Sequence, residues 1–505
     1  MQAIHSQTLA THLRSVGMKT CTEMGDENAS KPHVAFLSSP GMGHITPLFE
    51  LALRLVGEHN FQVTFLVITT DATVAQYNYL HANSHHDLHI VDLPPADMSG
   101  RVFDDMTPAT RFCVIAQESI RPLRSVLSGL NRPKLKAFII DIFCTGVFDT
   151  CKELSIPVYS FFTAPTALLA FSLYLPTLDR EVEGEFVDLP EPVKVPGCKQ
   201  IRTQDLPGPV LNRKIDEYKW YLLHVSRLSM STGIFVNTWD DLEPVWLKAL
   251  KYEQFFLDIP TPPVYPVGPL TKGSEPVSNG NEKDIMAWLD IQPRDSVLLV
   301  SLGSGGTLTS VQLTELAIGL ELSQQRFILV VRTPSDCASA AFFTAGFDSD
   351  DPIAYLPDGF VERTKEVGLV VSSWVPQVAV LNHSSIGAFL SHCGWNSTLE
   401  SVKHGVPMIG LPLYAEQRMN ATMLSDEIGV AVKMPVVGEG GETVVVGRKE
   451  IERVVRMVME GEEGKKLKSR AKELETSARK TLSRGGSSYE TLARVAELLR
   501  REEDS

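Results

Sequence analysis

The first half of the chain alternates short apolar runs with longer stretches in which apolar residues recur at helical spacing. The first apolar run is followed by a glycine turn and by an amphipathic helix, predicted from about residue 46 to 56. Because strands and helices alternate, we predict a largely parallel sheet with helical crossovers. The apolar runs predict strands at residues 33–39, 61–68, 88–93, 137–143, 157–162, 232–238 and 264–270.

A change of composition separates this half from the second. Residues 271–282 are rich in glycine, serine, asparagine and charge, which predicts a linker. Because 505 residues exceed one ordinary core, we predict two α/β domains, residues 32–270 and 283–480, and a C-terminal helix at residues 481–505. In the second domain, apolar runs predict strands at residues 297–301, 326–331, 386–390 and 407–413.

The start of the chain shows no hydrophobic periodicity. We therefore expect residues 1–31 to be a disordered extension, with Met18 and Met24 as alternative start positions. Its first twenty residues contain serine and threonine but no acid, which is a feature of transit peptides. They lack the apolar stretch of a secretory signal.

The composition is that of a globular protein and argues against several classes of function. Hydrophobic residues make up 43% of the chain and charged residues 21%. A net charge of −14 argues against nucleic-acid or anionic-membrane partners, since both need a basic surface. No apolar run reaches the ~18 residues that span a bilayer. The seven cysteines are scattered without C-x-x-C spacing, which favours free thiols and a cytoplasmic location.

Residues 374–417 contain the densest set of candidate binding groups. An apolar run ends at His392 and Gly394, and a helix-compatible segment begins immediately afterwards. The free N–H groups and the positive dipole at such a helix start form a site for an anion, usually a phosphate. Asn396 and Glu400 share one helix face, with the amide near the anion and the carboxylate one turn further, where it suits a ribose diol.

Aromatic, amide and acidic groups lie at both ends of the same stretch. Trp374 offers a flat face to a base, and Gln377 offers an amide to a sugar or a base. Glu416 and Gln417 follow a second apolar run, near the end of a predicted strand, where ligands bind in open α/β sheets. Taken singly, each of these residues also has a structural interpretation as a buried aromatic, a core residue or a helix cap.

Two residues of the first half are candidate catalytic groups. His44 lies at the start of the first predicted helix, where the helix dipole disfavours the imidazolium and keeps the ring a proton acceptor. Asp141 interrupts the apolar run AFIIDIF, and a carboxylate buried there needs a partner. If Asp141 accepts a ring N–H of His44, it fixes the tautomer and stabilises the protonated ring. Capping of a turn or loop is the structural alternative for both residues.

Residues 374–417 read WVPQVAVLNHSSIGAFLSHCGWNSTLESVKHGVPMIGLPLYAEQ. Nearly end to end, this stretch resembles the signature box of plant secondary-product glycosyltransferases, the family 1 enzymes that use UDP-sugars. The segments SPGMGHITPLFELA, VSLGSGGTLT and YPVGPL are similar to the subgroup that glucosylates hydroquinone, other small phenols and monolignols. The resemblance implies the α/β arrangement called GT-B, in which two Rossmann-like domains face each other across a cleft and the C-terminal helix crosses back to the first domain.

The resemblance also implies how the donor is bound. A glutamine at the end of the box goes with glucose in this family, so UDP-glucose is the expected donor. The implied donor-binding residues are Trp374 for uracil, Gln377 and Glu400 for the ribose, His392, Asn396, Ser397 and Ser304 for the diphosphate, Trp395, Glu416 and Gln417 for the sugar, and Val375 and Gly394 beside them.

Catalysis and acceptor binding are implied for the first domain. His44 and Asp141 match the positions of the family's His-Asp dyad, which acts as general base. The implied reaction is an inverting O-glucosyl transfer to small phenolic or related aromatic hydroxyls, such as those of hydroquinone, monolignols or indoxyl, which gives β-glucosides without a metal or other cofactor. The expected acceptor contacts are Gly43, Ile142, Phe143 and Phe171.

One further motif and three alternative functions are weighed against this interpretation. Residues 348–350 form a D-x-D motif, but its place in a long irregular loop favours solvated acids over a metal site. An NAD-dependent oxidoreductase is disfavoured because G-x-G-x-x-G is absent from the sequence. A nucleotide-sugar epimerase and a non-catalytic UDP-sugar-binding protein remain as alternatives. We expect a monomer without a membrane span or a nucleic-acid partner.

Overall fold

The computed structural model describes residues 31–501 apart from seven short segments. The segments outside the description are 83–84, 102–105, 131–133, 274–279, 336–350, 373 and 439–443. The D-x-D motif, half of the predicted linker and all of the predicted extension except residue 31 therefore lie outside the described residues.

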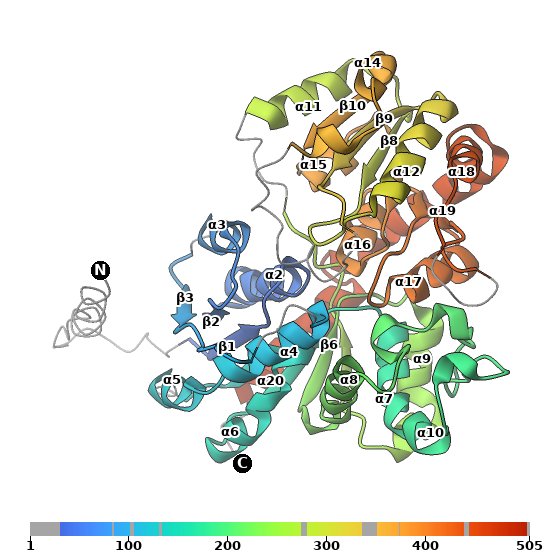
Figure 1. Cartoon of the computed structure of the whole chain (residues 1–505). Helices are drawn as coiled ribbons and strands as arrows, with labels where there is room; N and C mark the ends of the chain where they lie inside the picture. Colours follow the sequence, from blue (N-terminus) through green and yellow to red (C-terminus); the bar gives the residue numbers. More distant parts are fainter. Residues whose placement is uncertain are drawn as a thin grey trace. The chain divides into compact units, whose positions relative to one another are not determined.

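The first sheet has seven parallel strands in the order β3-β2-β1-β4-β5-β6-β7 (Figure 1). The fourth strand ends at Asp141, two residues before the predicted end, because the Asp141 carboxylate accepts the Phe143 N–H and caps a 3₁₀ helix at Ile142–Val147. The strands are β1 (His33–Ser38), β2 (Gln62–Ile68), β3 (Leu88–Leu93), β4 (Ala137–Asp141), β5 (Val158–Phe162), β6 (Gly233–Val236) and β7 (Val264–Pro266).

The second sheet has six parallel strands in the order β10-β9-β8-β11-β12-β13. Two of them, β10 and β13, were not predicted from the sequence. The strands are β8 (Val297–Ser301), β9 (Arg326–Val331), β10 (Gly368–Ser372), β11 (Ile386–Ser391), β12 (Met408–Gly410) and β13 (Ala431–Lys433). The predicted fold class, two Rossmann-like α/β domains, is confirmed.

Helices connect the parallel strands of both sheets, because a parallel pair needs a crossover. In the first domain they are α2 (Met42–His59), α3 (Val74–Ala82), α4 (Pro108–Ser119), α5 (Leu123–Leu130), α6 (Phe148–Glu153), α7 (Thr166–Glu181), α8 (Asp216–Ser226), α9 (Pro244–Tyr252) and α10 (Gln254–Asp258). In the second they are α11 (Gly280–Asp290), α12 (Ser310–Ser323), α14 (Phe360–Thr364), α15 (Gln377–Leu381), α16 (Trp395–Lys403), α17 (Gln417–Met423), α18 (Arg448–Glu460) and α19 (Glu462–Leu482). None of the described helices is long and apolar enough to cross a membrane.

The last helix, α20 (Ser487–Arg501), packs on the first domain although it follows the second in the chain (Figure 1). Leu492, Val495 and Leu499 are buried in the same apolar cluster as residues of β1, β2 and α2. Arg500 also donates a hydrogen bond to the His59 carbonyl, where α2 ends. By its packing, the end of the chain therefore belongs to the first domain.

Candidate active site

A cavity of about 1750 Å³ opens at the carboxyl ends of strands from both sheets. Drug-sized ligands occupy roughly 300–1,000 Å³, so this cavity has room for two ligands side by side. It is lined from one domain by the starts of α2 and of the 3₁₀ helix at Ile142–Val147, and from the other by the turns after β8 and β11. Ligands bind at this end of the strands in open α/β sheets.

His44 lies in the first turn of α2 and lines the cavity. The helix begins at Met42, earlier than predicted, because Gly41 turns the chain with a φ of 110° that other residues avoid. The Nδ1 atom of His44 lies 3.1 Å from an Asp141 carboxylate oxygen and 3.3 Å from the Thr163 hydroxyl. A ring that carries its proton on Nδ1 keeps Nε2 free to accept another proton.

Asp141 lies directly beneath His44 and is fully buried. Its carboxylate accepts the Ser39 N–H at 2.9 Å, the Ser39 hydroxyl, and the Phe143 N–H at 3.0 Å. Burial raises the pKa of Asp141, but the bonds from His44 and Ser39 outweigh burial and leave this pKa below its usual value. The carboxylate therefore stays ionised and can stabilise a protonated His44.

The turn after β11 holds His392 in a fixed position. Its ring is buried, and burial lowers its pKa to about 4, so the ring is neutral. A Cβ atom on Gly303 or Gly394 would come within 2.6 Å or 2.4 Å of ring atoms of His392, so only glycine fits at these two positions. Cys393, between His392 and Gly394, has a left-handed backbone with a φ of 63°. Two glycines and a strained turn thus present a neutral imidazole to the cavity.

Helix α16 begins at the same turn, so the N–H groups of its first turn face the cavity. The side chains of Trp395 and Asn396 bond across to the first domain. The Trp395 indole N–H donates to the Asn237 carbonyl at 2.8 Å, and the Asn396 amide donates to the Gly43 carbonyl at 3.1 Å. The sequence predicted that these two side chains contact the sugar and the diphosphate. In this structure the Trp395 indole N–H and one N–H of the Asn396 amide are engaged between the domains, while the backbone N–H groups of the first turn face the cavity.

A hydrogen-bonded network lies behind this helix start. The Gln377 amide donates to Glu400 at 2.7 Å and to the Ser397 hydroxyl at 3.1 Å, and its oxygen accepts the Ser301 hydroxyl at 3.2 Å. Burial raises the pKa of Glu400 to about 7. Hydroxyl donors from a ligand would favour the ionised form, as the predicted ribose site requires.

An aromatic surface and a cation lie at the rim of the cavity. Trp374 is 50% exposed, and the Lys272 ammonium group lies 5.8 Å from the centre of its ring. The side chain of Val375 is buried in the core, so its backbone is the part that can face a ligand. Ser304 is exposed on the turn after β8, and Arg332 donates to its carbonyl. These five residues all line the cavity together with the network.

Glu416 and Gln417 lie where α17 begins, and both line the cavity. Burial raises the pKa of Glu416. The Gln417 side-chain oxygen accepts the N–H groups of Leu413 and Tyr414 at 2.8 and 3.0 Å. The sequence predicted that Gln417 offers both an acceptor and donors to a sugar. Because the acceptor holds the loop, only the amide NH₂ group is left to donate, and it also contacts the Tyr414 side chain.

On the acceptor side, three of the four predicted contacts line the cavity. Gly43, Ile142 and Phe143 do so, and the Phe143 ring lies 5.1 Å from that of His44. Phe171 does not: it is fully buried in the core of the first domain and absent from the cavity wall. Its apolar segment forms the inner side of α7, so the prediction that Phe171 contacts the acceptor is wrong.

Sequence reasoning missed several other residues of the acceptor wall. Glu217 and Tyr221 are spaced i,i+4 on α8, which packs against α4. Tyr221 bonds the Ser172 hydroxyl at 2.7 Å, and burial raises the pKa of Glu217. The i,i+4 spacing was visible in the sequence, but only the packing of α8 directs this face to the cavity. Further residues of this wall are Thr107, Phe112, Cys113, Thr163 and Leu168.

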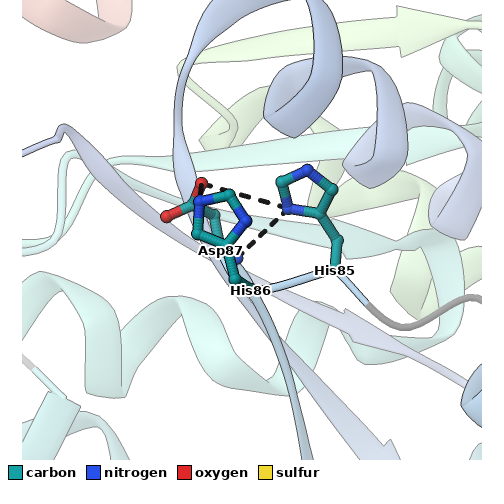
Figure 2. A group of neighbouring side chains, drawn as sticks. All are labelled: His85, His86 and Asp87. Atoms are coloured by element: carbon teal, nitrogen blue, oxygen red, sulfur yellow. Dashed lines mark hydrogen bonds and ion pairs between the residues drawn. The ribbon is translucent and has the colours of Figure 1, made fainter.

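Another group of possible metal ligands lies at the start of β3, outside the cavity lining. Figure 2 shows His85, His86 and Asp87, whose ligand atoms all lie within 4.8 Å of one another. The His86 ring lies 2.7 Å from Asp87, and Nδ1 of His85 accepts the Asp87 backbone N–H at 3.2 Å. The lone pair of His85 Nδ1 is therefore already used by the Asp87 N–H, and both histidine rings are exposed, so we assign no role to this group.

Comparison with known proteins shows which family the chain resembles. The family model for UDP-glucoronosyl and UDP-glucosyl transferases matches residues 267–465. The chain is 45% identical to anthocyanidin 3-O-glucosyltransferase 5 of Manihot esculenta over 91% of this chain and 94% of the relative. It is also 45% identical to hydroquinone glucosyltransferase of Rauvolfia serpentina, over 92% and 97% of the two chains.

Solved structures agree with these relatives. TcCGT1 in complex with UDP superimposes with a TM-score of 0.87 at 46% identity, covering 94% of this chain and all of that one (100%). UGT2 of Phytolacca americana, complexed with UDP-2fluoro-glucose and pterostilbene, gives a TM-score of 0.82 at 40% identity, with 93% and 100% covered.

Proposed function

Because this chain belongs to the plant family 1 UDP-glycosyltransferases, we propose that it transfers glucose from UDP-glucose to a hydroxyl group of a small phenol. The predicted class, a UDP-dependent glycosyltransferase, is confirmed by the same relatives. One observation carries the finer proposal. His44 lines the cavity that also contains the start of α16, and its ring lies 3.1 Å from the buried carboxylate of Asp141.

The chemistry follows from this pairing. The Nε2 atom of His44 takes the proton of the acceptor hydroxyl, and the oxygen attacks the anomeric carbon of the donor. The bond from that carbon to the diphosphate breaks, and UDP leaves with the electron pair toward the N–H groups of α16. Direct displacement inverts the anomeric carbon and gives a β-glucoside. General-base help of this kind contributes about 10²–10⁴-fold in rate.

A phenolic acceptor is supported by the apolar wall and by the relatives. The ring of Phe143 lies beside His44, where it can stack on an aromatic acceptor. Two relatives carry anthocyanidin and hydroquinone in their names, and a solved neighbour holds pterostilbene. All three compounds are phenols.

We also propose that transfer needs no metal, that the protein works as a monomer and that it resides in the cytoplasm. Protein donors at the start of α16 can stabilise the leaving diphosphate without a cation. The cysteines among the described residues carry free thiols, which supports a reducing compartment. Full activity in EDTA is the expected result; loss of activity that manganese restores would contradict the metal-free proposal.

The donor preference is tested with the three donors UDP-glucose, UDP-galactose and UDP-glucuronate on hydroquinone. We expect the highest kcat/KM for UDP-glucose, by about ten- to a hundred-fold, because inverting one sugar hydroxyl leaves a buried polar group unpaired. Gln417→Glu keeps an oxygen for the loop N–H groups but removes the amide donors, so it should lower kcat/KM and spare UDP binding. Equal values for the three donors would refute the glucose assignment.

A further inference from the structure

Asn420, on the first turns of α17, is fully buried and does not line the cavity. Its side-chain amide donates to two oxygens at once. One is the Cys393 carbonyl at 2.9 Å, and the other is a Glu416 carboxylate oxygen at 3.2 Å. The amide thus joins the turn that begins the anion site to the carboxylate expected to bind the sugar.

The orientation of this amide is fixed by chemistry. Both neighbouring atoms, the Cys393 carbonyl and the Glu416 carboxylate, are acceptors when Glu416 is ionised, so only the NH₂ group can face them. The Asn420 oxygen is then left buried without a partner among the described residues. An unpaired buried acceptor costs roughly 1–3 kcal/mol, so the side chain is not optimised for stability alone.

The two partners of the amide both need support. Cys393 has a left-handed backbone, and its thiol packs so closely on Gly410 that a Cβ there would come within 2.9 Å of the sulfur. Glu416 is a carboxylate whose burial opposes its charge. His44 also interacts electrostatically with Glu416, so this carboxylate lies near the reacting centre.

We propose that Asn420 is a positioning residue that locks the sugar-binding carboxylate Glu416 to the anion-binding turn at His392–Gly394. The carboxylate that binds the sugar hydroxyls and the turn that binds the diphosphate then keep a fixed distance and orientation. Asn420 itself contacts neither the sugar nor the diphosphate. This inference deepens the proposed function and rests on its assignment of UDP-glucose as donor. Transfer requires that the groups contacting the sugar and the diphosphate are held in place, because small displacements of positioning groups have large effects on rate.

The test compares two substitutions of different chemistry. Asn420→Ala removes both donors, and Asn420→Asp keeps the shape but turns a carboxylate toward two acceptors. We expect kcat/KM for UDP-glucose to fall about tenfold in Asn420→Ala and about a hundredfold in Asn420→Asp. The dissociation constant for UDP, measured by calorimetry, should change by less than about threefold. Asn382→Asp, at an exposed position, is the matched control and should leave both values unchanged.

A double-mutant cycle shows whether Asn420 acts through Glu416. In a Glu416→Gln background the repulsion from Glu416 is gone while that from the Cys393 carbonyl stays, so Asn420→Asp should cost at least tenfold less than it does in the wild type. Equal losses in both backgrounds, or a UDP affinity that falls in proportion to kcat/KM, would overturn the inference and leave Asn420 as a support of the fold. If the wild type prefers another donor, the donor assignment fails, while the cycle still tests the positioning role with that donor.

Discussion

Asp141 in the first domain and Glu400 in the second are both buried carboxylates, one behind His44 and the other on the cavity lining, yet their pKa values move in opposite directions. The pKa of Asp141 is lowered, whereas that of Glu400 is raised to about 7. Asp141 accepts bonds from Ser39 and Phe143 and contacts His44. Glu400 has one amide donor, from Gln377.

The difference shows how the two domains divide the work. On the side of the base, the protein supplies every donor itself, so the charge is in place before a substrate arrives. At the proposed nucleotide site, the Glu400 carboxylate can still accept further hydrogen bonds, which a ligand would donate. The first site is therefore preorganised, while the second is completed by binding.

The largest effect should come from the preorganised side. His44→Ala should lower kcat/KM by about 10²–10⁴-fold, because it removes the proposed general base. Asp141→Asn should slow transfer less, since it favours the wrong tautomer but leaves the ring in place. The dissociation constant for UDP should hardly change in either variant, because the nucleotide binds to the other domain. A UDP affinity that falls in step with the rate, or a wild-type rate for Asp141→Asn, would contradict the dyad.

Glu400→Gln tests the side completed by the ligand. The folded pKa of about 7 lies above the unfolded value, so the stability linked to protonated Glu400 is present below pH ~4.5 and is lost as the pH rises through 7. The wild type should consequently bind UDP more tightly as the pH rises through 7, because the ribose hydroxyls prefer the carboxylate. We expect Glu400→Gln to weaken UDP binding about tenfold at pH 8 and to abolish this slope.

Calorimetry of UDP binding from pH 5.5 to 8.5 is done on the wild type and on Glu400→Gln. The phosphate of UDP titrates identically in the two experiments, so a difference between their pH profiles comes from Glu400. Parallel pH profiles for the two proteins would show that Glu400 does not meet the ribose.

Ser39→Ala should weaken the contrast between the two carboxylates. It removes the hydroxyl donor of Asp141 but keeps the backbone N–H, so the pKa of Asp141 should rise. A depressed carboxylate pKa stabilises the fold at pH values above its unfolded value, and that stability is lost as the pH falls through the folded pKa. Acid unfolding of Ser39→Ala should therefore begin at a higher pH than in the wild type, with kcat/KM lower by about tenfold. Unchanged acid unfolding would show that the backbone N–H alone is sufficient.

The smallest effect separates the core from the cavity wall. Phe171→Leu should leave KM for a phenolic acceptor unchanged and lower the free energy of unfolding by about 1 kcal/mol, because Phe171 is a core residue. Phe143→Leu removes the ring beside His44 and should raise that KM several-fold. A raised acceptor KM in Phe171→Leu would return this residue to the site.

The sequence by itself determined the strands whose apolar runs are bounded by clear turn signals. Strands β3, β8 and β9 have the predicted bounds, and β1 and β2 differ by one residue at one end. It also predicted the donor side, because most of the proposed donor-binding groups follow one another within 374–417 and form one pattern. The two edge regions β10 and β13 escaped prediction because their short runs carry little periodicity.

Only the tertiary structure decided which donors are free. The side chains of Trp395 and Asn396 donate hydrogen bonds to the first domain, and the Gln417 oxygen accepts N–H groups of its own loop. These bonds use polar groups that the sequence alone suggested for a ligand. It also decided that Phe171 is core while Glu217 faces the cavity, because the direction of a helical side chain depends on what the helix packs against. The sequence fixes which groups exist and their spacing along an element; partners from distant segments decide which of them remain unpaired and available for chemistry.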